Sequence, residues 1–393
     1  MILGASILQL PAIKKARELR LQTIVVDMNP NAIGSDVEGI EKEVISTIDI
    51  PAIVDAAKRH KIDGIMTLAT DMPMRAVAAV AKELNIVGIS DHTALKATNK
   101  AEMRAALKAG NVPIPEFYKA SNEKEYMEAV SQFKVPFIVK PVDNSGSRGI
   151  FEVIDITNQK LISEAYSYSH QFSRNGDIVV EEYMRGSEVS VETLSIDGIC
   201  HVIQITDKLT TGAPHYVEMG HSQPTMHNEI VSQQIAKVAK AANKAIGIEN
   251  GPSHTEIIVT QDGPKIVELG ARLGGDCIAT HLVPLSTGVD MVAACIRIAL
   301  GEKPDIVPKI QKGSAIRYFK QTAGKVESIV GLENAKKMNG VTQISVVHGV
   351  GETITEIDSS GARMGFIIAQ DENAETAIKD CEQALECIQV EIK

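Results

Sequence analysis

Three short segments of the chain combine charged and small residues in a way that suits a phosphorylated ligand. In the first, an apolar run at 135–139 ends at Lys140 and is followed by the loop Pro-Val-Asp-Asn-Ser-Gly-Ser-Arg-Gly, 141–149. Small residues let backbone N–H groups approach phosphate oxygens, and a lysine neutralises their charge. The spacing of a Walker loop is absent, and a Ser/Gly loop after a strand is by itself often only a hairpin.

The second segment follows a strand-like run at 178–182 and mixes acidic with apolar residues up to Glu188. Its backbone groups suit the edge of an adenine base, and a carboxylate at its end suits the hydroxyls of a ribose. Taken alone, the same pattern also fits an edge strand followed by a solvated acidic turn. The segment therefore gains meaning only from its neighbours.

The third segment carries two carboxylates and an arginine. Glu256 and Glu268 lie in two strand-like runs, 253–260 and 264–269, that are separated by Gln-Asp-Gly, which predicts a hairpin. Two carboxylates on adjacent strands are suited to Mg²⁺ ions that bridge nucleotide phosphates. Arg272, four residues beyond the second carboxylate, is suited to stabilising a phosphoryl group in transfer. An isolated hairpin with an ion pair is the simpler alternative.

The elements that must position these residues begin with alternating strands and helices. Strand-like runs at 1–4, 23–27, 64–68 and 86–89 alternate with helical patterns at 8–19, 51–60 and 74–84. Such alternation predicts βαβ units and a doubly wound parallel sheet. The turn after the first run lacks the G-x-G-x-x-G spacing, so NAD binding is a weak alternative in spite of Asp27 at the end of the second run.

The remaining elements are mixed. Helices are predicted at 100–109, 123–130 (with a cap at Ser121), 230–246, 291–300 and 374–388, and further strands at 150–153, 188–195 and 200–205. The polar stretch 207–227 shows little periodicity and is predicted to be a loop that closes over the site. Residues 359–393 are predicted to form a strand and then a helix that packs on the rest.

Charge and composition narrow the class of protein. The net charge is -10 and no Lys/Arg cluster stands out, which argues against nucleic acid and membrane surfaces as partners. No apolar stretch of about 18 residues predicts a transmembrane helix, and the first residues do not resemble a signal peptide. Five cysteines without a C-x-x-C pair favour reduced thiols and a cytoplasmic location.

Taken together and in this order, the three segments resemble the ATP-grasp superfamily over about residues 1 to 330. The nearest resemblance is to bacterial L-amino acid ligases, on KPVDNSGSRG, EEYMRGSEVSVE, VEMGHSQPT and ELGARLGGD running on to ATHLVPLSTGVDM. It implies an α/β chain that is α+β in its ATP-grasp part. The implied units are a Rossmann-like domain at 1–92, a two-lobed ATP-grasp domain at 93–305 with a lid at about 115–185, and a C-terminal lobe at 306–393.

The resemblance also implies roles for individual residues. Its implied ATP contacts are Lys100, Lys140 and Lys208 at the phosphates, the closing loop Ser145, Gly146, Ser147, Arg148 and Gly149, Glu181 at the adenine amino group, Glu182, Tyr183 and Met184 beside the base, and Glu188 at the ribose. Glu256 and Glu268 would bind Mg²⁺, with Mn²⁺ as a substitute. Arg272 would bridge the phosphoryl group and the substrate carboxylate. Glu218 and His221 would face an amino-acid substrate, with Gly275 beside it.

The activity implied is that of an ATP-dependent ligase that makes an acyl phosphate from a carboxylate and transfers it to an amine. The partners implied are a small carboxylate and a small amine, and a homodimer is compatible with the family. Alternatives are carbamoyl phosphate synthase-like or purine-precursor ligase-like chemistry, or a non-catalytic nucleotide-binding protein. One departure is Gly270, where many relatives have an asparagine that ligates metal.

Overall fold

A parallel sheet of four strands begins the chain in the computed structural model, which describes residues 1–393 except 145, 147 and 214. The strand order is β3-β2-β1-β4, and every pair is parallel. The predicted doubly wound domain is therefore confirmed. Its elements are β1 (Ile2–Leu3), α1 (Leu10–Glu18), β2 (Thr23–Val26), β3 (Ile40–Glu43), α2 (Ile50–His60), β4 (Met66–Thr67), α3 (Met74–Leu84) and α4 (Asp91–Thr98).

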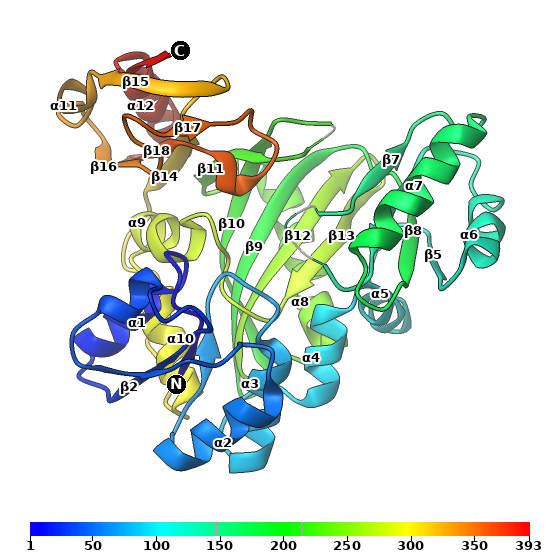
Figure 1. Cartoon of the computed structure of the whole chain (residues 1–393), viewed down its shortest axis with the longest axis horizontal. Helices are drawn as coiled ribbons and strands as arrows, with labels where there is room; N and C mark the ends of the chain where they lie inside the picture. The colour runs from blue at the N-terminus through cyan, green and yellow to red at the C-terminus, as the bar shows by residue number, and fades with distance from the viewer. Residues whose placement is uncertain (145, 147, 214) are drawn as a thin grey trace.

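Alternate side chains of this sheet enter two different cores. Leu3 packs in the core that contains residues of α2 and α3, whereas Ile2 packs with residues of α1 and of α10 (Met291–Ala299). In Figure 1 α10 lies beside α1, although about 270 residues of chain separate them. The second face of the parallel sheet is thus covered in part by a helix from the last third of the chain, which ties the two parts together.

A second, antiparallel sheet forms a small lid with its own core. Its strand order is β5-β8-β6-β7, and two helices pack on it. Buried aromatic residues fill the space, among them Tyr126 and Phe137, and the Tyr126 hydroxyl donates to the backbone oxygen of Ile162 at 2.8 Å. The elements are β5 (Phe117–Ala120), α6 (Glu123–Val130), β6 (Phe137–Pro141), β7 (Phe151–Val153), α7 (Gln159–Phe172) and β8 (Ile178–Glu182).

The third sheet is antiparallel, has eight strands and carries most of the candidate site. Its order is β13-β12-β9-β10-β11-β14-β18-β16. Helices α5 (Lys100–Ala109) and α8 (Glu229–Ile246) pack against one face of this sheet, on apolar side chains such as Val189 and Ile257 that alternate with Glu188 and Glu256. The strands are β9 (Ser187–Ile196), β10 (Ile199–Thr210), β11 (Glu218–Gln223), β12 (Gly251–Thr260), β13 (Gly263–Gly270), β14 (Gly313–Tyr318), β16 (Val341–Val346) and β18 (Gly365–Asp371).

Part of the C-terminal segment extends this sheet. Strand β14 pairs with β11, and β18 and β16 follow it outward. The other elements here are α9 (Val283–Thr287), β15 (Gly324–Val330), α11 (Leu332–Ala335), β17 (Thr353–Ile354), α12 (Ala374–Glu386) and β19 (Gln389–Ile392). Strands β17, β15 and β19 pair in this order and form a small fourth sheet, which is also antiparallel.

Several predictions of local structure are wrong. The run 86–89 forms no strand, and the polar stretch 207–227 is not one continuous loop, because β10 reaches Thr210 and β11 covers Glu218–Gln223. The cap of α6 is Asn122, whose side chain accepts from the backbone of Glu125, and not Ser121. Helices α4 and α7 and strand β3 were not predicted. Strand β3 (Ile-Glu-Lys-Glu) has no fully buried residue, so it carries little hydrophobic signal.

No single helix in the described ranges is long and apolar enough to cross a membrane. A bent pair, Ile278–Thr287 with Met291–Ala299, passes the length and composition test only when taken together, at an angle of 114°.

Candidate active site

A buried ion-pair triad lies where the lid meets the large sheet. The Glu181 carboxylate of β8 accepts from Arg104 Nε at 2.6 Å, Arg104 Nη2 at 3.0 Å and Lys140 Nζ at 2.9 Å. The Glu181 side chain is 1% exposed. Burial by itself raises the pKa of this carboxyl, but the charges of Arg104 and Lys140 outweigh it and hold the pKa at about 2. Glu181 is therefore ionised and its oxygens are already engaged, which fits a role in orienting Lys140.

Arg104 is a member of this triad that the sequence did not reveal. Besides Glu181, its guanidinium donates to the backbone oxygens of Ile266 at 3.2 Å and Val267 at 2.8 Å. These residues belong to β13, the strand that carries Glu268. Arg104 thus couples the lid to the strand of a predicted metal ligand. The only sequence signal is an arginine four residues after Lys100, on the same face of α5.

We expect Glu181→Gln to remove an acid-dependent part of the stability. The folded pKa of about 2 lies below the ordinary value of 4.5, so the carboxylate stabilises the fold above pH 4.5 and this contribution is lost as the pH falls toward 2. The full shift corresponds to about 3 kcal/mol. Urea unfolding at pH 6, 4.5 and 3.5 measures it. The wild type should lose stability more steeply than Glu181→Gln, and equal slopes would contradict the prediction.

The predicted phosphate loop is joined by Lys100 to β13, the strand of the predicted metal ligand Glu268. Its Nζ donates to the backbone oxygen of Asn144 at 2.8 Å and to Glu268 Oε1 at 2.8 Å. Gly146 and Gly149 have φ of +66° and +82°, which favours glycine at both positions. Arg148 lies between them. Ser145 and Ser147, also predicted to belong to this loop, lie outside the described residues.

The segment predicted to lie beside adenine continues directly from β8. The backbone N–H of Glu182 donates to Glu116 O at 2.9 Å and that of Tyr183 to Pro136 O at 3.0 Å, so these two donors are not free for a base. The Tyr183 hydroxyl lies 3.1 Å from that of Tyr216, in the connection between β10 and β11. Met184, which follows, is half-buried. The segment therefore forms a joint between the lid and the large sheet.

Four of the predicted site residues meet around one ammonium group. Lys208 Nζ lies 2.5 Å from Glu188, 3.1 Å from Glu256 and 3.6 Å from Glu218, and its side chain is 3% exposed. Burial lowers the pKa of a lysine, but these three carboxylates raise that of Lys208 well above its usual range. Residues 188, 208, 218 and 256 come from four neighbouring strands, with Glu188 opposite Ile258 and Glu218 opposite Thr210 in the register, so that the three carboxylates approach the ammonium group from different sides. The surplus of carboxylates suits the addition of cations.

Glu256 and Glu268 face one another on β12 and β13. They are direct partners in the antiparallel register, which brings the two side chains to within reach of one ion. Their side chains are 24% and 31% exposed, so both are open to a ligand. Among the residues that the structure describes, no group of three or more His, Cys, Asp or Glu forms a ready-made metal site. Two carboxylates suit Mg²⁺, which usually keeps waters and phosphate oxygens as its other ligands.

A buried histidine, His254, lies beside Glu256 on the same strand. His254 Nδ1 lies 2.5 Å from Glu192, which has no exposed surface, and His254 Nε2 lies 3.5 Å from Glu256. Burial lowers the pKa of His254, but Glu192 outweighs burial and the pKa stands at about 9. A Cβ at Gly274 would lie 2.8 Å from both His254 and Glu192, so only glycine fits there. Glu192 is the last residue of the motif EEYMRGSEVSVE but was not among the predicted site residues, and it lies 62 residues from its partner.

Arg272 is held by an aspartate of the N-terminal domain. Asp71 accepts from Nε at 3.0 Å and from Nη2 at 3.1 Å, in a fork geometry. The contact depends on a close approach of the segment after β4 to the segment after β13. Ala69 N donates to Leu273 O at 3.3 Å, and Leu68 and Leu273 form an isolated parallel bridge. A Cβ at Gly270 would lie 2.4 Å from Asp71 Oδ1. The departure from asparagine at 270 therefore has a steric reason.

We expect Asp71→Asn to lower kcat about tenfold while leaving nucleotide affinity unchanged, because a neutral amide cannot hold the guanidinium by two charge-assisted bonds. Gly270→Ala should act on the same fork by pushing Asp71 aside. Steady-state kinetics and titration of ATP check both variants. A loss of ATP affinity as large as the loss of kcat would contradict a role in orienting Arg272.

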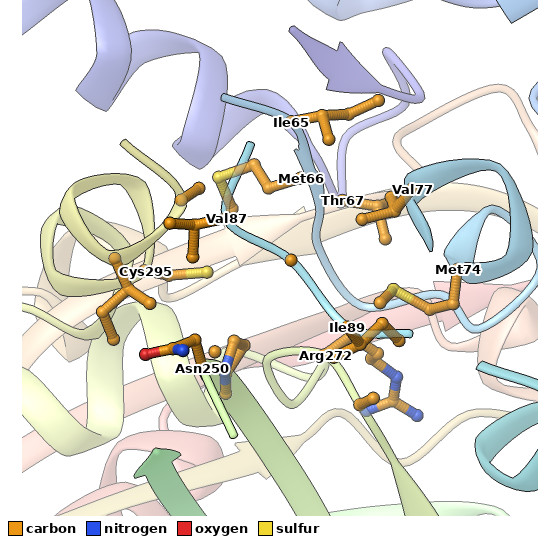
Figure 2. Close-up of a pocket in the computed structure, with 16 residues that line it drawn as sticks. Ile65, Met66, Thr67, Met74, Val77, Val87, Ile89, Asn250, Arg272 and Cys295 are labelled. Carbon is orange, nitrogen blue, oxygen red and sulfur yellow. The ribbon is translucent and has the colours of Figure 1, made fainter. Parts of the chain in front are cut away.

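An apolar cavity separates the N-terminal sheet from the loop of Arg272 (Figure 2). Met66 and Met74 line it from the N-terminal domain and Cys295 from α10, with Arg272 at its rim. The cavity is also lined by Val87 and Ile89. These belong to the run predicted as a strand, so its apolar character reflects packing at the domain boundary and not a sheet.

Glu218 and His221 lie on β11, which pairs with the strand of Lys208, and His221 is the direct register partner of Lys208. His221 is 1% exposed, and its Nε2 lies 3.5 Å from Asp276 Oδ2. Gly275 lies opposite the N-terminal domain, where an added Cβ would be 3.5 Å from that of Ala69. The predicted substrate residues are thus brought together at the end of the site away from the lid, and Asp276 is a member that was not predicted.

Comparison with known proteins now identifies the architecture. Residues 133–280 match the family model of the ATP-grasp domain, and residues 317–393 match that of L-amino acid ligase C-terminal domain 2. The chain contains an ATP-grasp domain. The predicted resemblance is confirmed. The prediction that the chain is an enzyme of the ATP-grasp carboxylate–amine ligase class is also confirmed.

Relatives of this ATP-grasp protein span more than one activity. It is 24% identical to an L-arginine-specific L-amino acid ligase of Bacillus subtilis, over 72% of this chain and 70% of the relative. It is also 24% identical to a phosphoribosylamine–glycine ligase of Methanococcus maripaludis, over 97% and 91%. The crystal structure of an L-amino acid ligase from Bacillus licheniformis has the same fold, with a TM-score of 0.85 at 22% identity over 100% and 98% of the two chains.

Proposed function

We propose that this ATP-grasp protein activates the carboxylate of an amino acid with ATP and joins it to an amine, releasing ADP and phosphate. The observation that carries the proposal is the position of Glu218 and His221. Glu218 shares the Lys208 ammonium with the predicted metal ligand Glu256, so groups suited to an amino-acid ammonium lie beside groups suited to ATP phosphates. The match of residues 317–393 to the L-amino acid ligases supports the same substrate class.

Charge neutralisation is the main task of the site. The γ-phosphoryl group of ATP and a carboxylate are both anions, and they meet only where cations offset their repulsion. Lys140 and Lys100 are suited to the phosphates and Arg272 to the oxygens of the group in transfer, each held in place by a carboxylate. Mg²⁺, held by Glu256 and Glu268, would add Lewis-acid charge at the phosphates. The acyl phosphate formed has a good leaving group for attack by the amine.

Water must be kept from the acyl phosphate, because hydrolysis would waste ATP. The lid and the predicted phosphate loop are expected to close over the nucleotide. The joint at Tyr183 and Tyr216 connects the lid to β10 and β11, the strands that carry Lys208, Glu218 and His221. We propose that these parts close together when both substrates are bound.

A purine-precursor ligase is the second candidate, because the Methanococcus relative covers nearly the whole chain. One experiment separates the two. ADP release from purified protein with Mg-ATP is measured with the twenty amino acids, singly and in pairs, and with phosphoribosylamine plus glycine. ADP release that requires amino acids, with a dipeptide mass, supports the proposal. Release only with phosphoribosylamine plus glycine would replace it.

A further inference from the structure

Arg363 reaches the site from the C-terminal part of the chain, just before β18. Its Nη1 and Nη2 donate to the two oxygens of Asp276 at 2.7 and 2.8 Å, which is a bidentate ion pair between segments 87 residues apart. The Arg363 side chain is only 8% exposed. A buried fork of this kind is strong and geometrically specific.

The same guanidinium makes further contacts that use nearly all of its donors. It stacks over the ring of Tyr318 at 3.8 Å and donates to the backbone oxygens of Glu218 and Ser360, each at 2.9 Å. Four of the five N–H groups of an arginine are thereby engaged. Arg363 is therefore suited to holding protein groups in place and has little left with which to bind a ligand.

The groups that it holds are those on the substrate side of the site. Asp276 lies 3.5 Å from His221 Nε2, and Glu218 begins the strand that carries His221. The Ser360 hydroxyl donates to the Glu218 carboxylate at 3.3 Å. Removal of the guanidinium would free both Asp276 and the segment around Ser360, so the two predicted substrate residues would lose their lateral support.

The backbone beside the ion pair needs such support. Asp276 and Cys277 have φ of +48° and +62°, in the left-handed region that residues with side chains rarely adopt. Conformations of this kind persist only where the surroundings fix them. The fork from Arg363 fixes the side chain of the first, and the loop follows directly after Gly275.

We propose that Arg363 is a positioning residue through which the C-terminal part of the chain sets the geometry of the organic-substrate site. The inference rests on the proposed function only in taking Glu218 and His221 to contact the substrate. It assigns the residues after 306 a part in substrate recognition and not only in packing. The predicted phosphate contacts Lys100 and Lys140 pair with Glu268 and Glu181 and not with the partners of Arg363, so nucleotide binding should not depend on Arg363.

The test compares Arg363→Ala with the wild type. We expect the KM for the most active amino acid of the panel to rise about tenfold or more, since charge-assisted bonds are lost. The Kd for Mg-ATP should stay within twofold. Added guanidinium chloride at millimolar concentration should restore part of the loss by filling the space between Asp276 and Tyr318. Arg363→Lys should not restore it, because an ammonium has no fork.

Arg297→Ala is the control. Arg297 lies on the surface of α10 and pairs with Glu302, so its replacement should leave the kinetics unchanged. Two results would overturn the inference. One is an unchanged KM in Arg363→Ala. The other is a parallel loss of ATP affinity, kcat and melting temperature without rescue by guanidinium, as expected for a purely structural residue.

A separate readout distinguishes failure of the inference from failure of the proposed function. Hydroxylamine traps an acyl phosphate as a hydroxamate, so a wild type that gives no hydroxamate with any amino acid contradicts the proposed function alone. The ring ¹⁵N resonances of His221, assigned with His221→Gln, then decide the inference. The chemical shifts of these resonances should change in Arg363→Ala, because Asp276 is released. Unchanged resonances would overturn the positioning role of Arg363, whatever the activity.

Discussion

Arg272→Ala should abolish turnover, with kcat lower by about 10²- to 10³-fold, as for the loss of a donor that stabilises charge in a transition state. Nucleotide binding should stay within a few-fold, because the phosphate-side lysines and their partners do not contact Arg272. The guanidinium is already oriented by Asp71, so little reorganisation is needed when the phosphoryl group moves. Single-turnover phosphate release and calorimetric ATP titration measure the two effects.

The variant leaves Asp71 as a poorly solvated carboxylate without its partner, which must be separated from the loss of catalysis. The double variant Arg272→Ala/Asp71→Ala provides this control. It should regain stability but no activity. Arg272→Lys keeps the charge but not the fork and should recover only a small part of kcat. A loss of ATP affinity comparable to the loss of kcat would instead indicate a structural role.

Glu268→Ala should reduce turnover by a similarly large factor and should not be rescued by raised Mg²⁺. Glu268 and Glu256 are opposite each other in one hairpin, and no third carboxylate pairs with them in that register. Loss of one ligand of two removes much of the protein's hold on the ion. The Mg²⁺ dependence of ADP release measures this directly.

Two variants sharpen the metal experiment. Glu268→Asp retains a carboxylate one methylene shorter and should shift the Mg²⁺ requirement upward while remaining rescuable. Glu333→Ala, at an exposed ion pair with Lys336, should change nothing. Full rescue of Glu268→Ala by Mg²⁺ would mean that Glu268 is not a principal ligand. Lys100 also pairs with Glu268, so Lys100→Ala is needed as a comparison. If Lys100→Ala loses as much turnover as Glu268→Ala, and neither variant changes the Mg²⁺ dependence of ADP release, the loss would be due to the phosphate loop and not to the metal.

What the sequence determined by itself was local. Two strand-like runs on either side of Gln-Asp-Gly predicted the hairpin, and the hairpin register places Glu256 against Glu268. The helix patterns of the first ninety residues predicted the parallel sheet. Residues whose chemistry is visible within one segment, such as Lys140 with its loop and Arg272 after β13, could be chosen before any fold was known.

What only the tertiary structure decided were the partners of those residues. Asp71 and Arg272 are 201 residues apart, and Arg104 meets Glu181 across 77 residues. Such pairs depend on how separate sheets and helices pack, which no pattern within one window encodes. Polar strands were missed for a related reason. Strand β11 lines the site with hydrophilic side chains, so the alternation that marks a half-buried strand is replaced by residues selected for chemistry.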